Sequence, residues 1–294
     1  MSRLVSILLS AALFFSGCVV HAAALPEEEP AAPAAVLQQP QEAADSGETA
    51  EPAPMEPEEP YVRVIDPAKP MVALTFDDGP HEIYSNQILD VLEANHAVAT
   101  FFEVGVNVAK YPAVVAREAE LGCEIGSHSY VHKNLSKMKA GPLLEDLAAA
   151  DAAFIAAGVP APTLVRPPYG AVNKTVRTAT GRSLITWNID TEDWRTKDPQ
   201  KVVSYVQSLQ NLDGAVVLMH SIRESSAQAA AALVPWLQEQ GYQLVTVTEL
   251  MAYYYGELPQ PNGLYGFTYF SQGRTDAPLT LPVPAAEPEA APAA

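Results

Sequence analysis

Two adjacent carboxylates end a short apolar run in the first third of the sequence. The run Met71–Phe76 is followed by Asp77, Asp78, Gly79 and Pro80. Neighbouring carboxylates repel each other, so both stay ionised only beside a cation or an arginine. The same four residues are also typical of a solvent-exposed turn. Taken alone, this segment is as typical of a turn as of a functional site.

Two histidines further along the chain have a spacing that suits metal binding. His128 and His132 flank the tripeptide Ser129-Tyr130-Val131. If this segment forms a helical turn, residues at i and i+4 lie on one face. Two imidazoles and one carboxylate are ligands of zinc or another divalent transition metal, and they leave a position for water. Surface helices also produce this spacing by chance, so the pair needs support from other residues.

More residues capable of chemistry come directly after other short apolar runs. They are Arg166 after Thr163–Val165, the segment Asp190–Trp194 after Ser183–Asn188, and His220 after Ala215–Met219. In a closed parallel barrel the carboxyl ends of the strands share one rim, where active sites lie. Such residues at five separate strand ends are unexpected in a purely structural protein.

The segments between these residues indicate an α/β domain. Short apolar runs alternate with longer segments of helical period, which is typical of a parallel sheet with helices outside it. The predicted strands are Met71–Phe76, Ala97–Phe102, Glu124–Ser127, Thr163–Val165, Ser183–Asn188, Ala215–Met219 and Gln243–Val245. The predicted helices are Ser85–Asn95, Tyr111–Leu121, Pro142–Ala157, Gln200–Leu209, Ser225–Gln240 and Val247–Tyr254. Residues 61–258 are long enough to enclose one sizeable core.

Five short segments together resemble the motifs of the polysaccharide deacetylase family, the NodB homology domain of carbohydrate esterase family 4. They are Thr75–Pro80, His128–His132, Arg166–Gly170, Asp190–Trp194 and Leu218–His220. They occur in the family's order across residues 65–255, and the set is far more specific than any one of them. The resemblance implies an α/β fold, a distorted (β/α) barrel of seven or eight units that forms a single catalytic domain with a metal at its mouth.

The resemblance also implies a role for each of the first residues of the set. Asp78, His128 and His132 would hold one divalent metal ion, with zinc expected and cobalt or another transition metal as the alternative. Asp77 would be the general base, and Arg166 would pair with it and hold its orientation. One metal can polarise an amide carbonyl and lower the pKa of water, so this chemistry suits amide hydrolysis.

The remaining matching residues would complete the site. His220 would be the general acid that protonates the leaving amine, with Asp193 on its other ring nitrogen favouring the imidazolium. Trp194 and Leu218 would wall the pocket for the acetyl methyl group, and the backbone N–H of Tyr169 would bind the oxyanion. A single residue that performs both proton transfers is the main variant of this mechanism.

Four nearby residues are interpreted more conservatively. Ser221 departs from the family, whose members often have Asp after the last histidine, and this departure removes neither a ligand nor the acid. Trp187 is predicted to be part of the core within a strand, and Tyr130 either touches the sugar or packs against a loop. Cys123 has no disulfide partner once Cys18 is cleaved or lipidated, and it is predicted to be a small buried residue.

The ends of the chain differ in composition from its middle. Residues 1–24 combine one base, an apolar run and small residues, which is typical of a secretory signal peptide. Cleavage occurs either among the small residues His21–Ala24 or before Cys18, which a lipobox-like Ser16-Gly17-Cys18 would make the lipidated first residue. Residues 25–60 hold ten acids and no base among Pro and Ala, so we expect a disordered linker. Residues 259–284 form a Tyr/Pro-rich extension and residues 285–294 a disordered tail.

The net charge and the terminal segments of the chain limit its expected location and binding partners. The whole chain carries a net charge of −18, but residues 61–284 hold 23 acids against 16 bases. A domain of this sign does not bind nucleic acid non-specifically, and it is compatible with a neutral polysaccharide. We expect an exported, extracellular or cell-surface monomer that contacts the membrane only through its signal peptide or a lipid on Cys18.

The motifs and the export signal together predict a hydrolase that removes N-acetyl groups from amino sugars of a cell-wall polysaccharide. Peptidoglycan is the first substrate expected. An O-deacetylase acting on xylan and a chitin-oligomer deacetylase are the alternatives among enzymes. A catalytically inactive wall-binding module is the alternative of another class. The complete set of ligands, base and acid argues against that last alternative.

Overall fold

The structure is a computed structural model that describes residues 63–279 and 281. The predicted signal peptide, the acidic linker and the C-terminal tail lie outside the described residues. Among the described residues, no helix combines the length and the apolar character needed to cross a bilayer.

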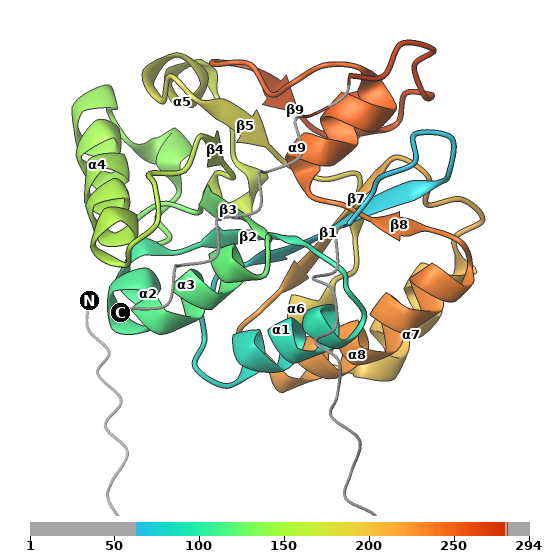
Figure 1. The fold of residues 1–294 in the computed structure, drawn as a ribbon. Helices are drawn as coiled ribbons and strands as arrows, with labels where there is room; N and C mark the ends of the chain where they lie inside the picture. The colour runs from blue at the N-terminus through green and yellow to red at the C-terminus, as the bar shows by residue number, and fades with distance from the viewer. Residues whose placement is uncertain (1–62, 280, 282–294) are drawn as a thin grey trace, which may run out of the picture. The chain divides into compact units, whose positions relative to one another are not determined.

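A parallel sheet forms the centre of the domain (Figure 1). Its strands follow the order β6-β7-β1-β2-β3-β4-β5-β9, and β8 also pairs with β1. All the pairs are parallel. The strands are β1 (Met71–Asp77), β2 (Thr100–Glu103), β3 (Glu124–Ser127), β4 (Leu164–Val165), β5 (Ser183–Ile185), β6 (Ile189–Asp190), β7 (Ala215–His220), β8 (Gln243–Leu244) and β9 (Leu264–Tyr265). The sheet curls into a half-barrel, which confirms the distorted α/β barrel expected from the sequence.

Helices surround the strands (Figure 1). They are α1 (Tyr84–Ala94), α2 (Gly105–Lys110), α3 (Pro112–Glu120), α4 (Ala140–Ala156), α5 (Lys174–Ala179), α6 (Asp193–Thr196), α7 (Pro199–Ser208), α8 (Glu224–Glu239), α9 (Val247–Leu250) and α10 (Phe267–Phe270). Short 3₁₀ turns lie at Leu135–Lys137 and Pro168–Gly170, and a π turn at Met251–Tyr255 extends α9.

Local sequence signals explain several of the helix starts. Pro112 and Pro199 stand at the first positions of α3 and α7, where a missing N–H costs nothing. The Asp198 side chain caps α7 by accepting from the N–H groups of Gln200 and Lys201. Helix α9 begins with a capping box. These signals let the predicted helices 200–209 and 247–254 begin within a residue of where the structure has them.

Alternation along β1 divides its side chains between two apolar clusters. Val72, Leu74 and Phe76 pack with residues of α1, α7 and α8, whereas Met71 and Ala73 face the interior cluster that includes α9 and β9. Because successive side chains of a strand point to opposite faces, Asp77 shares the interior face. The burial of this strand on both faces therefore carries the first carboxylate into the barrel.

The C-terminal extension contributes to the sheet. Residues 259–284 were expected to follow the domain, but β9 within them pairs with β5 in the register Leu184↔Leu264. The predicted strand Ser183–Asn188 was too long, because β5 ends at Ile185. Trp187 beyond it is half-buried against the interior cluster. Some short elements were not predicted from the sequence: α2, α5, α6, α10 and β6.

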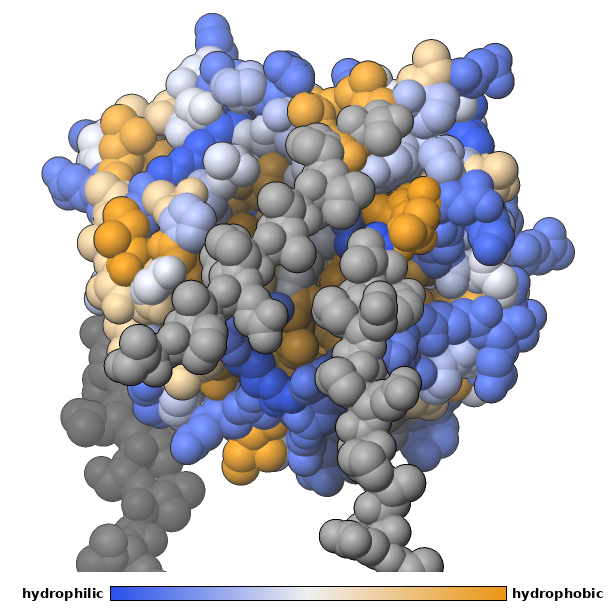
Figure 2. All heavy atoms as spheres, in the orientation of Figure 1, coloured by the Kyte–Doolittle hydropathy of each residue, from blue (hydrophilic) through white to orange (hydrophobic). Residues whose placement is uncertain are grey.

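The surface of the domain is mixed. Figure 2 shows hydrophilic side chains over α1 and α3, with hydrophobic side chains gathered on the side of α4. Leu144 and Ile155 of α4 are among the exposed large apolar residues.

Candidate metal and catalytic site

The strand ends bring two carboxylates and two histidines together. Asp78 Oδ1 lies 3.1 Å from His132 Nε2 and 3.5 Å from His128 Nε2. Ligand atoms of these three side chains all lie within 4.8 Å of one another. Asp77 points its second oxygen toward the same place, because Asp77 Oδ2 is 3.8 Å from His128 Nε2.

The hydrogen bonds of His128 test whether these residues suit a cation. The Nδ1 atom of His128 lies 2.6 Å from the carbonyl oxygen of Arg166, so Nδ1 carries the proton and donates it. Burial lowers the pKa of this imidazole, despite the opposing charges of Asp77 and Asp78. The neutral ring then turns the lone pair of Nε2 toward Asp78 Oδ1, a buried atom without a hydrogen-bond donor among the described residues. Acceptors that face each other fit a metal ion placed between them.

The two histidines meet through an irregular loop. We expected a helical turn, but residues 128–132 form no helix, and Ser129 and His132 have φ values of +68° and +56°. Ser129 Oγ accepts the N–H of His132 at 3.0 Å and holds the bend. The intervening Tyr130 packs beside the cluster of α2 and α4. The spacing thus predicted proximity correctly for the wrong conformational reason.

Arg166 anchors the first carboxylate from inside the barrel. Its Nη1 donates to Asp77 Oδ1 at 2.7 Å and to Thr75 Oγ1 at 2.7 Å. The guanidinium is fully buried, stacks 4.0 Å from the ring centre of Phe102 and lies 5.6 Å from that of Trp187. With so many contacts, Arg166 fixes one oxygen of Asp77 and leaves the other facing the histidines.

His220 stands at the end of the neighbouring strand. It pairs in register with Asp77 across β1 and β7, so the two side chains share the interior face. Its Nδ1 lies 2.8 Å from Asp193 Oδ1, and its backbone N–H donates to Asp193 Oδ2 at 2.8 Å. The same carboxylate accepts from Ser226 Oγ at 2.6 Å and from the N–H of Trp194 at 2.9 Å. Four hydrogen bonds therefore hold the fully buried Asp193 carboxylate in place.

This carboxylate controls the charge of the histidine. Burial lowers the pKa of His220, but the hydrogen bond and charge of Asp193 outweigh burial. The charges of Asp77 and Asp78 act in the same direction, and the pKa of His220 lies above its ordinary value. His220 is therefore suited to stay protonated near neutral pH and to donate a proton from Nε2.

The three residues expected to contact substrate lie around this group. The ring of Tyr169 stands edge-on to His132 with 4.8 Å between ring centres, and its backbone takes φ +64°. Tyr169 and Trp194 are 67% and 46% exposed, so both side chains are accessible to a ligand. Leu218 is buried and precedes His220 by two residues, on the same face of β7. Their roles toward substrate stay predictions.

Several supporting residues carried no signal in the sequence. Thr75 and Ser226 hold Arg166 and Asp193, and Asn107 Nδ2 donates to the carbonyl of Asp78 at 2.8 Å. Cys123, by contrast, is the buried small residue that was predicted, and burial raises the pKa of its thiol to about 12.

Two buried glutamates lie behind the Asp77–Pro80 loop. Glu103 and Glu118 are fully buried, and no described donor hydrogen-bonds to their carboxyl oxygens. A Cβ atom on Gly79 would come within 2.7 Å of Glu103 Oε2 and 2.3 Å of Ser221 Oγ, so a larger residue there would displace these side chains. Burial raises the pKa of Glu103 well above its usual range and that of Glu118 to about 8, and the negative charge of Glu118 raises the pKa of Glu103 further. Such a pair needs a proton.

Replacing Glu118 by Gln should make stability less dependent on pH. The folded chain keeps a proton that the unfolded chain, with an ordinary glutamate pKa, releases, so the free energy of unfolding falls between about pH 4.5 and pH 8. Glu118→Gln keeps a donor to Glu103 without titrating. At about pH 8 we expect the variant to be more stable than the wild type by on the order of 1–3 kcal/mol, with little difference near pH 5.

Thermal unfolding at both pH values checks this expectation. Glu120→Gln changes an exposed carboxylate of the same helix and serves as the control, with an unchanged pH dependence. Parallel pH curves for Glu118→Gln and the wild type would show that the buried pair is not protonated.

Comparisons with known proteins connect this geometry to characterised proteins. Residues 65–184 match the family model described as polysaccharide deacetylase. The chain is 38% identical over 191 residues to the peptidoglycan-N-acetylmuramic acid deacetylase PdaC of Bacillus subtilis, covering 65% of this chain and 41% of that protein. It is 35% identical over 191 residues to a peptidoglycan-N-acetylglucosamine deacetylase of Bacillus cereus, covering 62% of this chain and 89% of that protein.

A solved structure shows the same fold. A structure described as T48 deacetylase with substrate superposes with a TM-score of 0.64 at 41% identity, covering 69% of this chain and all of that one. The chain spans about two fifths of the length of PdaC and of the peptidoglycan-N-acetylglucosamine deacetylase PgdA of Listeria monocytogenes. The similarity therefore concerns the domain that carries the site.

Proposed function

The chain belongs to the polysaccharide deacetylase family, and on that premise we propose that it is a metal-dependent hydrolase that removes N-acetyl groups from amino sugars of peptidoglycan. One observation carries the proposal. Asp77 and His220 end adjacent strands in register, each is held by a buried partner of opposite charge, and the Asp78, His128 and His132 group lies beside them. A base and an acid thus flank one place where a reacting amide can sit.

The metal would be held by Asp78, His128 and His132. A divalent ion there supplies Lewis-acid activation of the acetyl carbonyl and of water. Two imidazole nitrogens and one carboxylate oxygen are a donor set that suits zinc, with cobalt or another transition metal as the alternative.

Asp77 accepts the proton of the attacking water in this proposal. Its oxygen toward Arg166 is occupied by a hydrogen bond of 2.7 Å, so the oxygen near the histidines is the one available to act. The buried guanidinium pairs with the carboxylate and fixes the direction from which Asp77 meets water.

His220 donates the proton that the departing sugar amine requires. Asp193 fixes Nδ1 as the inner donor, so Nε2 is the nitrogen that meets substrate. The base and the acid are therefore separate residues, with a carboxylate–arginine pair on one side and an imidazolium–carboxylate pair on the other.

Peptidoglycan is the substrate best supported by the relatives. PdaC, PgdA and the Bacillus cereus proteins are named as peptidoglycan deacetylases. A bifunctional xylanase/deacetylase of Pseudobutyrivibrio xylanivorans is 37% identical over 186 residues, so xylan is the competing substrate. The expected export signal in residues 1–24 suits a substrate outside the membrane.

Acetate release tests the proposal. Purified protein is incubated with peptidoglycan, chitin oligomers and acetylated xylan, first as purified, then with chelator, then with zinc or cobalt restored. We expect release from peptidoglycan that the chelator abolishes and the metal restores. Release from xylan alone would make acetylated xylan the substrate in place of peptidoglycan. No release from any polymer would overturn the enzyme assignment in favour of an inactive wall-binding module.

A further inference from the structure

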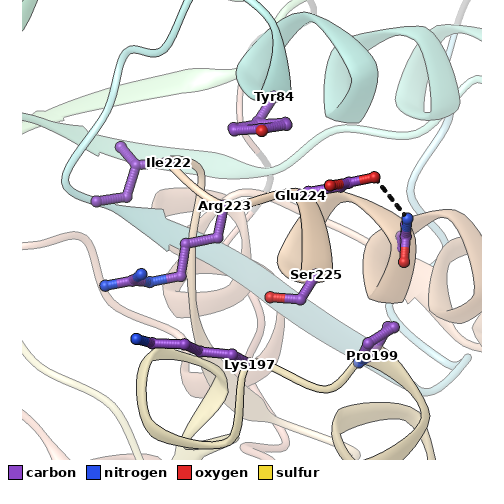
Figure 3. Close-up of a pocket in the computed structure, with 8 residues that line it drawn as sticks. Tyr84, Lys197, Pro199, Ile222, Arg223, Glu224 and Ser225 are labelled. Carbon is purple, nitrogen blue, oxygen red and sulfur yellow. Dashed lines mark hydrogen bonds between the residues drawn. The ribbon is translucent and has the colours of Figure 1, made fainter. Parts of the chain in front are cut away.

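A hollow lies beside the catalytic group at the same end of the strands. It has a volume of about 470 Å³ and is lined among others by Tyr84, Lys197, Ile222, Arg223, Glu224 and Ser225 (Figure 3). These residues lie beyond the ends of β1, β6 and β7. Asp77 and His220 end β1 and β7, and Asp193 begins α6, which follows β6. We call this hollow the Lys197–Arg223 pocket.

Two cations in the pocket have no partner within the part of the chain that the structure describes. Among the arginines of residues 63–279, Arg223 alone has a guanidinium that makes no ion pair and no hydrogen bond with a described residue. Its Nε atom is buried and has no hydrogen-bond partner among the described residues. The amine of Lys197 likewise makes no ion pair or hydrogen bond within the described part of the chain. Lys197 is exposed, so the buried Nε of Arg223 is the observation that points to a ligand, because a buried polar atom normally finds a partner.

The anionic residue of the pocket does not neutralise these cations. Glu224 Oε1 accepts from Gln228 Nε2 at 3.1 Å. Figure 3 shows the carboxylate of Glu224 turned away from Arg223 and Lys197, which extend to the opposite side. The hydroxyl of Ser225 faces the cations' side. Arg223 is also the cap residue of the 16-residue helix α8 and has no side-chain cap, so the positive end of that helix adds to the potential. Tyr84 and Ile222 provide apolar walls.

The pocket is tied mechanically to the acid. Arg223 follows His220 by three residues, and the N–H of Lys197 donates to the carbonyl of Asp193 at 3.0 Å. Ser85 Oγ donates to the carbonyl of Ser221 at 3.4 Å and joins the first turn of α1 to the loop after β7. A polymer whose acetamide reaches His220 therefore has the pocket within reach of its neighbouring substituents.

We propose that the Lys197–Arg223 pocket is an anion subsite that binds a carboxylate of the peptide attached to the glycan strand. The proposal rests on the proposed function and deepens it. Peptidoglycan carries short peptides with free carboxylates on alternate sugars, whereas chitin and xylan backbones with acetyl groups are neutral. A guanidinium, an amine and a hydroxyl between apolar walls match a peptide carboxylate and its flanking chain. The pocket would select peptide-bearing glycan at a distance from the bond that breaks.

The experiment compares two variants on two forms of one substrate. Lys197→Gln/Arg223→Gln removes both charges, and Lys139→Gln/Arg177→Gln removes a lysine and an arginine elsewhere on the surface as a matched control. Each is assayed on soluble glycan strands with their peptides and on the same strands after an amidase has removed the peptides. We expect the pocket variant to have a KM raised about 5- to 10-fold on peptide-bearing strands, with kcat unchanged and no change on peptide-free strands. The wild-type preference for peptide-bearing strands should weaken as salt is added.

The outcomes separate this inference from the proposed function. Equal KM values for the pocket variant and the wild type on peptide-bearing strands would overturn the subsite while acetate release still stands. An equal rise of KM on both forms would show a contact with the sugar instead of the peptide. Competition by inorganic phosphate but not by the free peptide would assign the pocket to a phosphate group and overturn the peptide carboxylate. No acetate release by the wild type from either form would overturn the proposed function itself.

Discussion

Asp77→Asn is expected to lower kcat/KM for acetate release by at least about a hundredfold, the size of effect that loss of a positioned general base produces. The asparagine side chain has nearly the same shape and can still accept a hydrogen bond from Arg166. It cannot take a proton from water. Because Asp77 is not one of the three proposed ligands, zinc binding measured by competition with a chromophoric chelator should be nearly unchanged. The loss would then fall on kcat.

The buried guanidinium makes a control necessary. Arg166 is fully buried, and Asp77→Asn removes its only ion-pair partner among the described residues, so the variant should also lose on the order of 3 kcal/mol of stability. Activity is therefore compared well below the unfolding temperature of the variant. Asp151→Asn breaks the Asp151–Arg182 pair, which lies outside the site, and should leave kcat unchanged. Asp77→Asn with more than a tenth of wild-type activity would mean that another group accepts the proton.

The sequence predicted the site better than it predicted the conformation around it. Reactive side chains were placed after short apolar runs, and a parallel sheet brings the ends of such runs to one rim whatever their exact bounds. Asp77, Arg166 and His220 meet for that reason alone. An error of several residues in a strand, such as the overlong Ser183–Asn188, therefore left the predicted assembly intact.

Other features depend on long-range packing that no local pattern reveals. The loop that joins His128 to His132 has two residues with left-handed backbone conformation. One of them is Ser129, and serine is not a residue type that predicts this conformation. In the sequence, Glu103 and Glu118 have the pattern of ordinary polar residues of a strand and a helix. In the structure both are fully buried and lie next to each other. The pairing of β9 with β5 joins segments far apart in the sequence, and each of these strands is only two or three residues long. Short strands of this kind have no alternation to detect.

The second large effect is expected from Asp193, which acts through His220. In the wild type the pKa of His220 lies above its ordinary value because Asp193 outweighs burial. Asp193→Asn removes the charge and leaves the burial, so the pKa of His220 should fall. An amide group in place of either oxygen would also face a donor, because both oxygens accept two hydrogen bonds each. The imidazole should then lose both its charge and its orientation.

The expected fall in the pKa of His220 determines how the pH dependence of activity changes in Asp193→Asn. The wild-type acid is protonated below a pKa that lies above 6.5, so kcat/KM declines only on the alkaline side of that value. In Asp193→Asn the decline should begin at lower pH, and the loss of activity should grow from about tenfold near pH 6 to a hundredfold or more near pH 8. Ser226→Ala, which removes one neutral donor and keeps the carboxylate, should leave the alkaline limb close to that of the wild type. His220→Asn should lose activity at every pH. Its pH profile should lack the alkaline decline that deprotonation of His220 causes in the wild type. If Asp193→Asn instead lowered kcat/KM by one constant factor from pH 6 to pH 8, Asp193 would only position His220, and the charge of the imidazolium would owe nothing to this carboxylate.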